Sequence, residues 1–382
     1  MNGKNKIAML TTTFFPQVGG AEYQVKWLAE ELSKNGNEVS LFTPYEANGF
    51  IESYGKYPLV NISLRKKDTN VFQDGSRMLY RFISNVLKIK PDIIHAHFAF
   101  SSGFLAVITK PIHKAPVVIT SHGEDIQLVE SIDYGLRRSK IKSYLIKFTL
   151  RYCDKHVLVS NSMKNDALCS GSSENKIEVI HNIFNPPNIE ITNSDEIDLK
   201  AKYGIKHSSK IILSVSRLHL QKGLNYLIEA MVTVLDKHPT ALLVIAGTGP
   251  EKENLERLCQ SKKIDKNVIF LGYITDKEKL ILTKACDIFC LPAIEEAFGI
   301  ALFDPMYFSK NIVATNVGGI PEVLGNDKML VPKMDSVGLA NAIIDVFDDD
   351  KNTLQYSTNQ LETFYPNSIV KQYSELYRSL LR

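Results

Sequence analysis

The chain has 382 residues, of which 44% are hydrophobic, enough to build two domains of ordinary size with a core in each. Its 45 basic and 42 acidic side chains leave a formal net charge of +3, too even a balance for a protein that binds nucleic acid through its charge. No apolar stretch approaches the ~18 residues that would span a bilayer. We therefore expect two α/β domains and no nucleic-acid partner.

The cysteines and the start of the chain bear on the cellular compartment. Five cysteines are scattered without a CxxC pair, as is typical of a reducing compartment. Cys286 and Cys290 fall in one apolar run, where burial in a core is favoured over metal binding. The basic start and the apolar run 7–10 could pass for a short signal peptide, but the threonines that follow favour a first core strand. The expected location is cytoplasmic.

The first half of the chain repeats strand, loop and helix. A first strand leads into a loop with Gly19 and Gly20, and the helix that follows carries Ala21, Val25 and Leu28 at the spacing of one helix face. The next strand completes a βαβ unit. The two glycines could bring backbone N–H groups against an anion or a reacting group, or could simply allow a tight turn. Strands of this half are predicted over 6–12, 38–43, 91–97, 116–120, 156–159 and 177–180.

Polar side chains gather where the strands of this half end. One predicted strand ends in His95 and His97, and the next is followed by His122 and Asp125. The carboxyl ends of parallel strands share one edge of a sheet, and that edge is where ligands bind in open α/β sheets. Three histidines at one edge favour a binding site over separate structural roles. Zinc is not expected, because no cysteine joins them.

The second half of the chain begins after 186–209, a segment rich in Asn, Pro, Ser, Asp and Lys that we interpret as a linker. Its first strand leads into Arg217, and Lys222 stands just before a helix. Two cations beside the free N–H groups of a helix start are typical of a diphosphate site, although a solvated basic loop would give the same pattern. Strands are predicted over 211–215, 241–246, 268–272, 285–291 and 311–315.

Glycines and carboxylates mark the loops after these later strands. Glu296 follows one strand, Asp304 lies in the helical pattern after it, and Gly318 and Gly319 follow the next strand. Glycine loops and helix N-termini favour phosphate, and carboxylates favour sugar hydroxyls. The residues therefore predict a nucleotide-sugar site at this edge of the second domain.

Taken together, these motifs resemble the retaining two-domain GT-B glycosyltransferases of family 4, the glycosyl transferases group 1. Each motif is weak alone, and their order and spacing carry the resemblance over nearly the whole chain. The matching segments are Gly19–Glu22, His95–His97, His122–Gly123 with Asp125, Asn182, Arg217, Lys222–Gly223, Gly247–Pro250, Glu296–Gly299 and Gly318–Glu322.

The resemblance implies an α/β fold with two Rossmann-like domains facing each other across a cleft. The N-terminal domain would cover 1–185 and take the acceptor. The C-terminal domain would cover 210–365 and bind the nucleotide-sugar. The amphipathic helix predicted over 366–382 would pack back onto the first domain.

The resemblance also implies roles for single residues. Arg217 and Lys222 would hold the donor diphosphate, and Glu296 would bind hydroxyls of the donor sugar. The expected catalytic residues are His122, Glu296 and Gly20. The expected donor-binding residues are Arg217, Lys222, Gly247, Gly249, Ile274, Glu296, Phe298, Gly299, Ile300 and Asp304, and the expected acceptor-side residues are Gly19, Gly20, His97 and Asp125. No metal and no other cofactor is expected.

The implied reaction moves a hexose-type sugar from a UDP- or GDP-linked donor to a glycan or lipid-linked acceptor, in the synthesis of cell-surface polysaccharide or glycoconjugate. The sequence departs from the family pattern at Asp304, where the family has Glu, and at Ala293, where it has Ser. Asn182 is followed by Ile where the family has Gly. Two rival functions stay open: a nucleotide-sugar epimerase of related architecture, and a catalytically silent subunit that binds sugar nucleotide.

The segment 137–155 predicts a possible membrane contact. It holds seven basic residues against one acidic residue, Asp154, and Ile141, Tyr144 and Phe148 fall on one helical face. This pattern suits a helix lying on an anionic lipid surface, and equally an amphipathic helix packed on the first domain. A protein held at the inner face of the cytoplasmic membrane is the corresponding expectation. The basic residues are Arg137, Arg138, Lys140, Lys142, Lys147, Arg151 and Lys155.

Overall fold

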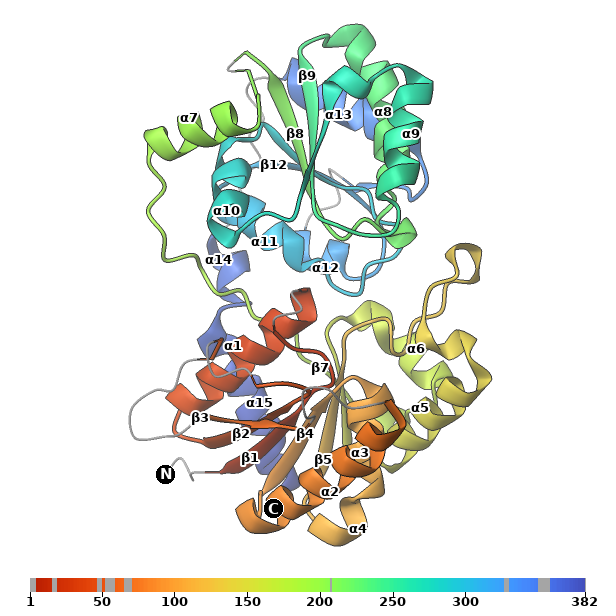
Figure 1. Ribbon diagram of the computed structural model, residues 1–382, viewed down its shortest axis with the longest axis vertical. Helices are drawn as coiled ribbons and strands as arrows, with labels where there is room; N and C mark the ends of the chain where they lie inside the picture. The colour runs from red at the N-terminus through yellow and green to blue at the C-terminus, as the bar shows by residue number, and fades with distance from the viewer. Residues whose placement is uncertain are drawn as a thin grey trace. The chain divides into compact units, whose positions relative to one another are not determined.

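The computed structural model describes residues 5–15, 19–46, 50–51, 59–64, 71–206, 208–325, 330–349 and 358–381 (Figure 1). The chain divides into two compact units. Unit 1 comprises residues 1–185 and 363–382, and unit 2 comprises residues 186–362. Each unit has its own parallel sheet and its own helices, as expected of two Rossmann-like domains.

Unit 1 contains a seven-stranded sheet in the order β3-β2-β1-β4-β5-β6-β7. All neighbouring strands run parallel, and the β4 and β5 strands are buried along their whole length, as strands covered on both faces must be. The strand order reverses between β1 and β4, so ligands are expected beyond their carboxyl ends. The strands are β1 (Lys6–Leu10), β2 (Glu38–Thr43), β3 (Leu59–Ser63), β4 (Ile93–His97), β5 (Val117–Ser121), β6 (Lys155–Leu158) and β7 (Ile177–Val179).

The first and last helices of the described chain share a core in unit 1. Val25, Leu28 and Leu32 of α1 are buried at helical spacing. Tyr373 and Tyr377 of α15 are buried in the same cluster, and α15 packs against α1, as the red and blue helices show (Figure 1). The helices of this unit are α1 (Gly20–Lys34), α2 (Val71–Ile89), α3 (Phe104–Ile108), α4 (Lys110–His113), α5 (Lys140–Tyr152), α6 (Lys164–Cys169) and α15 (Pro366–Leu380).

Unit 2 contains a six-stranded parallel sheet in the order β10-β9-β8-β11-β12-β13. The order reverses between β8 and β11, which places the ligand-binding crevice of this unit beyond the ends of those two strands. The strands are β8 (Lys210–Val215), β9 (Ala241–Ala246), β10 (Val268–Gly272), β11 (Ile288–Leu291), β12 (Asn311–Thr315) and β13 (Leu330–Val331).

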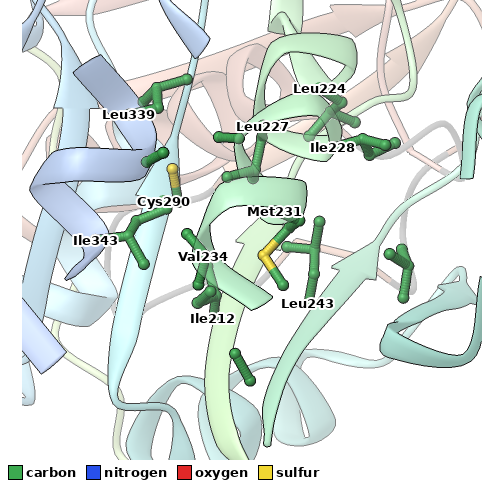
Figure 2. Packing of buried hydrophobic residues seen from close by; sticks show 14 of the residues in the cluster. Ile212, Leu224, Leu227, Ile228, Met231, Val234, Leu243, Cys290, Leu339 and Ile343 are labelled. Carbon is green, nitrogen blue, oxygen red and sulfur yellow. The ribbon is translucent and has the colours of Figure 1, made fainter. Parts of the chain in front are cut away.

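One face of this sheet is covered by α8 and α13, which pack on each other and on the strands. Figure 2 shows Leu227 and Met231 of α8 directed toward Ile212 and Leu243, and Ile343 of α13 close to the same layer. The helices of unit 2 are α7 (Asn193–Lys202), α8 (Leu224–Lys237), α9 (Lys252–Lys262), α10 (Asp276–Ala285), α11 (Phe303–Tyr307), α12 (Ile320–Leu324), α13 (Ser336–Asp348) and α14 (Thr358–Glu362).

The structure differs from the sequence-based expectation in the segment predicted as a linker. Residues 193–202 form helix α7, which packs on α10 inside unit 2. Thr192 and Asp195 form a capping box at its start, and Asp195 also pairs with Lys277 at 2.7 Å. The polar composition of this segment therefore reflects an exposed helix that needs few apolar residues. The strand predicted from Ala285 begins instead at Ile288, because Ala285 ends α10.

In the described ranges, no helix combines the length and the apolar character needed to cross a membrane.

Candidate active site

The loops after β8 and β11 lie against each other at the reversal point of unit 2. The backbone N–H groups of Ile294 and Glu295 both donate to the carbonyl of Gln221, at 2.8 and 3.3 Å. Gly223 has φ +62°, and a Cβ there would come 2.0 Å from the carbonyl oxygen of Pro292. Only glycine fits this close approach of two backbones. The loops are therefore in direct backbone contact at the point where the strand order reverses.

Lys222 and Glu296 form an ion pair across this contact. Lys222 Nζ lies 2.6 Å from Glu296 Oε2, and the two side chains are only 13% and 15% exposed. The structure thus brings together two residues that are 74 positions apart and that the sequence had assigned to different parts of a donor, the diphosphate and the sugar. A partly buried charge is costly without a partner of opposite charge, and in this pair each side chain is the partner of the other.

Arg217 differs from Lys222 in having no partner within the described ranges. Its side chain is exposed, and it makes no hydrogen bond or ion pair with any residue that the structure describes. Two glycines support its loop, because a Cβ at Gly247 would meet the carbonyl of Ser216 at 1.8 Å and one at Gly249 the carbonyl of Leu218 at 2.2 Å. An unpaired guanidinium on a rigid loop can bind a phosphate without first breaking another contact.

The N-terminus of α8 completes this group. Gly223 is its N-cap residue, and no side chain accepts from the first N–H groups of the helix. Those groups and the helix dipole favour an anion. Arg217, Lys222 and the start of α8 thus belong to one loop after β8, and their chemistry suits a diphosphate.

The glycines after β12 hold the backbone at Glu296. Gly319 donates its N–H to the carbonyl of Glu296 at 3.1 Å, and a Cβ at Gly318 would come 1.7 Å from that oxygen. Thr315 donates its hydroxyl to the carbonyl of Ala293 at 2.6 Å. Ala293 is fully buried, so its methyl group fills space at the position where the family has a serine. These contacts fix the position of the Glu296 backbone, from which the side chain with its carboxylate extends.

The remaining residues predicted to bind the donor differ in how buried they are and in whether they have a charged partner. Phe298 is buried, with its ring 5.7 Å from that of Phe303, so only its backbone can face a ligand in this conformation. Asp304 pairs with Lys279 at 2.8 Å, and Lys279 is a residue that the sequence analysis did not single out. Gly299 has φ +105°, which favours glycine, and begins the turn that contains Ile300. Ile274 is half-buried between β10 and α10.

The matching edge of unit 1 holds the histidines. His97 Nδ1 lies 3.0 Å from His122 Nε2, and the two rings stack with centroids 5.3 Å apart. The ring of Phe98 also contacts His122, at 4.9 Å, and Phe98 has φ +72°. A positive φ in a residue other than glycine is a strained conformation of the kind that clusters at functional sites. Burial lowers the pKa of His122 to about 4, so its ring is neutral near pH 7.

His95 is engaged on both ring nitrogens. Its Nδ1 lies 2.7 Å from the hydroxyl of Tyr377, and its Nε2 lies 2.7 Å from the hydroxyl of Thr120. The side chain is fully buried, and burial lowers its pKa to about 3. His95 therefore ties helix α15 to the sheet and has no nitrogen left for a ligand.

Asp125 joins two loops of this edge. Its carboxylate accepts from the backbone N–H of Ala99 at 2.8 Å and from those of His122 and Gly123 at 3.2 Å each. The side chain is fully buried, and burial raises its pKa while the backbone donors act in the opposite direction. The geometry makes Asp125 a support for His122, with its carboxylate enclosed.

Gly19 and Gly20 form the start of α1. Gly19 is the N-cap residue in an ordinary extended conformation, and no side chain caps the helix. A Cβ at Gly19 would come 2.6 Å from the carboxylate of Glu22. In the described part of the chain no side chain bonds the first N–H groups of α1, and a role for these groups toward a ligand stays a prediction. Among the described residues, no group of three or more His, Cys, Asp or Glu side chains could hold a metal ion.

Comparisons with known proteins agree with this arrangement of two units. Residues 18–186 match the family described as Glycosyltransferase Family 4, and residues 195–362 match Glycosyl transferases group 1. An uncharacterized glycosyltransferase of Methanocaldococcus jannaschii is 31% identical over 334 residues, which cover 84% of this chain and 83% of that protein. The N-acetyl-alpha-D-glucosaminyl L-malate synthase of Bacillus anthracis is 26% identical, over 97% of this chain and 96% of that protein.

Solved structures share the fold over the full length. The Anabaena protein HepE, solved with UDP and glucose, aligns with a TM-score of 0.81 at 19% identity, over 98% of this chain and all of that one. Sucrose-phosphate synthase of Thermosynechococcus elongatus aligns with a TM-score of 0.80 at 21% identity, over 99% of each chain. Together with the residues matched above, these findings show that the chain is a glycosyltransferase and belongs to family 4 of the GT-B glycosyltransferases.

Proposed function

We propose that this enzyme moves a hexose-type sugar from a UDP- or GDP-linked donor to a glycan or lipid-linked acceptor, with retention of the anomeric configuration and without a metal ion. The observation that carries the proposal is the group formed by Arg217, Lys222 and the start of α8, which offers two cations and free N–H donors beside Glu296. HepE was solved with UDP and with UDP-glucose, and this favours UDP as the nucleotide.

Donor binding in this proposal exchanges one partner for another. The diphosphate takes Lys222 away from Glu296 and binds the unpaired Arg217 at the same time. The freed carboxylate of Glu296 then accepts hydrogen bonds from hydroxyls of the donor sugar, the role that carboxylates commonly have with sugars. The glycines at 318 and 319 keep the backbone of Glu296 in place during the exchange.

The chemical step needs stabilisation of a leaving diphosphate. The bond between the anomeric carbon and the diphosphate oxygen breaks, and the negative charge that develops is stabilised by Arg217, Lys222 and the helix start. The acceptor hydroxyl attacks from the same face, and its proton passes to an oxygen of the leaving phosphate. Retention follows from this same-face route, which requires no nucleophile from the protein.

The acceptor side of the proposal rests on helix α5. The relatives include an Alpha-monoglucosyldiacylglycerol synthase of Streptococcus pneumoniae, 29% identical over 81% of this chain and 70% of that protein. In this chain, α5 turns Ile146, Thr149 and Leu150 toward the core, whereas Ile141 and Tyr144 are 76% and 70% exposed. Most of the apolar face predicted from the sequence thus faces outward. An exposed apolar face of this kind marks an interaction surface.

The charges beside this face fit an anionic membrane. Lys140, Lys147 and Arg151 are exposed and form no ion pair with the described residues, whereas Lys155 pairs with Glu178 at 2.7 Å. Free basic residues beside exposed apolar side chains suit an interfacial helix, each basic residue contributing about 1 kcal/mol near the lipid surface. We therefore propose a lipid-linked acceptor met at an anionic membrane surface.

The donor is tested by a thermal-shift screen of UDP-, GDP- and ADP-sugars, because a bound donor raises the melting temperature by mass action. Slow hydrolysis of the stabilising donor is expected of a transferase. Appearance of a new sugar nucleotide would indicate the epimerase instead, and binding with neither product would indicate a silent subunit.

The mechanism is tested on the product and with a chelator. Proton NMR of the product from an α-linked donor should show an α linkage, and EDTA should leave turnover unchanged. A β linkage would contradict the same-face route. Activity lost in EDTA and restored by manganese would contradict the proposal of a metal-free reaction.

The membrane contact is tested by vesicle co-sedimentation at low and high salt. Binding to anionic vesicles, lost in high salt and after replacing Lys140, Lys147 and Arg151 by Gln, is the expected result. A control with the same change in charge replaces Lys262, Lys263 and Lys266, which are exposed on unit 2, and should still bind. Equal recovery in the supernatant with all variants and salts would favour an acceptor in solution.

A further inference from the structure

The hydrogen bond between His97 and His122 determines what His122 can offer to a ligand. The two nitrogens, Nδ1 of His97 and Nε2 of His122, lie 3.0 Å apart, a normal hydrogen-bond length. One of them must carry the proton and the other must accept it. The choice also fixes whether the remaining nitrogen of His122, Nδ1, is a donor or an acceptor.

Both rings are neutral at physiological pH. Burial lowers the pKa of His97 well below 6.5 and that of His122 to about 4. A neutral imidazole carries one proton on one of its two nitrogens. If His97 donates from Nδ1, His122 holds its own proton on Nδ1; if His122 donates from Nε2, its Nδ1 is a bare acceptor.

The surroundings of His97 favour the first arrangement. Its Nε2 is buried and has no hydrogen-bond partner among the described residues. A proton at that position would leave a buried N–H without an acceptor, at a cost of about 1–3 kcal/mol. A proton on Nδ1 leaves only a lone pair unmatched, and buried N–H groups without partners are the rarer case in proteins. His97 therefore donates and His122 accepts.

We propose that His97 is a positioning residue that holds His122 in its Nδ1–H tautomer, so that His122 gives a hydrogen bond to a ligand oxygen. His122 is partly exposed, unlike His95 and His97, and its Nδ1 makes no hydrogen bond with any described residue. The identity of the ligand rests on the proposed function: the oxygen belongs to a hydroxyl of a sugar substrate.

This assignment excludes one catalytic role for His122. In this tautomer the protonated Nδ1 has no lone pair for a further proton, and the lone pair of Nε2 already accepts from His97. His122 is thus a donor and not the general base, and the acceptor's proton goes to the leaving phosphate. Asp125 supports the arrangement, because its carboxylate fixes the backbone N–H of His122 at 3.2 Å.

The test is the tautomer itself, read from two-bond and three-bond proton–nitrogen correlations of the full-length protein labelled with ¹⁵N at histidine. The His122 signals are assigned from the spectrum of His122→Asn. At pH 7.5 we expect a protonated Nδ1 and a bare Nε2 in His122, without any donor present. A protonated Nε2 would overturn the proposal, whatever the enzyme transfers.

Two variants of His97 separate positioning from packing. The amide nitrogen of His97→Asn lies near the position of Nδ1 and can still donate, whereas that of His97→Gln lies near Nε2 and cannot. His122 should keep its tautomer in the Asn variant and shift toward the Nε2–H form in the Gln variant. An unchanged tautomer in a folded Gln variant would overturn the proposal. If that variant does not fold, the spectrum of the wild type still decides.

The enzymatic activity of the same variants supplies a second test of the positioning role. Loss of a fixed donor at His122 should lower kcat about three- to tenfold in His97→Gln, as expected for one neutral hydrogen bond, and His97→Asn should recover most of it. Equal losses in the two variants would indicate a purely structural role. Because the tautomer is measured without substrate, absence of glycosyl transfer would contradict the proposed function and leave this result standing.

Discussion

The two units use the same strand-end edge for opposite chemistry. In unit 2 the edge presents an exposed Arg217 with no ion pair to a described residue, and an ion pair between Lys222 and Glu296, on loops that only glycine permits. In unit 1 the edge presents buried neutral histidines, His95 and His97, beside the partly exposed His122. The topology places both sites, but the side chains decide that one suits an anion and the other a neutral hydroxyl.

The largest difference should come from the glycine that closes the unit 2 edge. Gly223 and Gly204 have φ of +62° and +67°, but a Cβ at Gly223 meets Pro292 at 2.0 Å, whereas nothing lies within 4 Å at Gly204. Gly204→Ala should cost about 1–2 kcal/mol of unfolding free energy from its backbone conformation alone. Gly223→Ala should cost about 1–3 kcal/mol more, because the backbones must move apart. Urea unfolding of both variants measures this.

Equal losses at Gly223 and Gly204 would contradict the close approach of the β8 and β11 loops, since the two glycines share their backbone conformation and differ in the space around them.

Within the unit 2 edge, the two cations should differ in their effect on stability. Lys222→Ala leaves the 15%-exposed Glu296 without its partner and should lower the unfolding free energy by about 1–3 kcal/mol. Arg217→Ala removes an exposed side chain with no ion pair to the described residues, and should change it by less than about 0.5 kcal/mol. Glu296→Gln combined with Lys222→Ala should recover part of the first loss. The free energy of unfolding is measured without a donor. Similar losses in the two alanine variants would contradict the expected difference between the two cations.

The buried histidines of unit 1 should make the protein sensitive to acid. Burial lowers the pKa of His95 and of His156 to about 3 and that of His122 to about 4, whereas the unfolded chain has histidines near 6.5. Below pH 6.5 the unfolded state therefore binds more protons, so stability is full above that pH and falls as the pH drops toward 4. Each histidine should contribute a slope of about 1.4 kcal/mol per pH unit in this window.

His156→Gln tests this slope, because Gln can keep the contact that His156 Nε2 makes with Ser121 at 2.9 Å. The variant should lose about 1.4 kcal/mol per pH unit of acid sensitivity between pH 6 and 4.5. Urea unfolding over this range gives the slope, and an unchanged slope would show that His156 is already protonated in the folded protein.

The smallest effect should come from the hydroxyl that ties α15 to unit 1. Tyr377→Phe removes the 2.7 Å hydrogen bond to His95 and should cost about 1 kcal/mol. Tyr373→Phe removes a longer contact, 3.3 Å to Thr120, and should cost less. Neither should change the affinity for UDP, since both lie in unit 1 and the proposed diphosphate site is in unit 2. A change in UDP affinity with intact stability would contradict the assignment of the diphosphate site to unit 2.

Strands with strong local signals were predictable from the sequence. The strands β2, β9 and β12 lie where alternating or continuous apolar residues placed them. Helix α2 was not predicted, although Phe82 and Val86 are buried at helical spacing and could have indicated it. Strand β3 was also missed, since only Leu59 of its five residues is buried.

The contacts within the sites could not be predicted. Lys222 and Glu296 meet because β8 is paired with β11, and no local pattern encodes the order of strands in a sheet. The bond between His97 and His122 likewise depends on the rotamers of two side chains, one at the end of β4 and one just after β5. The sequence indicates which residues gather at an edge, and the packing decides which of them touch.

The most direct test of the central claim, that the unit 2 edge binds the donor diphosphate, is a calorimetric titration with UDP or GDP, whichever the donor screen selects. Arg217→Ala should weaken binding by about 1.5–3 kcal/mol, roughly 10- to 150-fold, as expected for a charged hydrogen bond. Arg257→Ala, which removes an exposed arginine of α9, should bind as the wild type does. Unchanged affinity in Arg217→Ala would contradict the account.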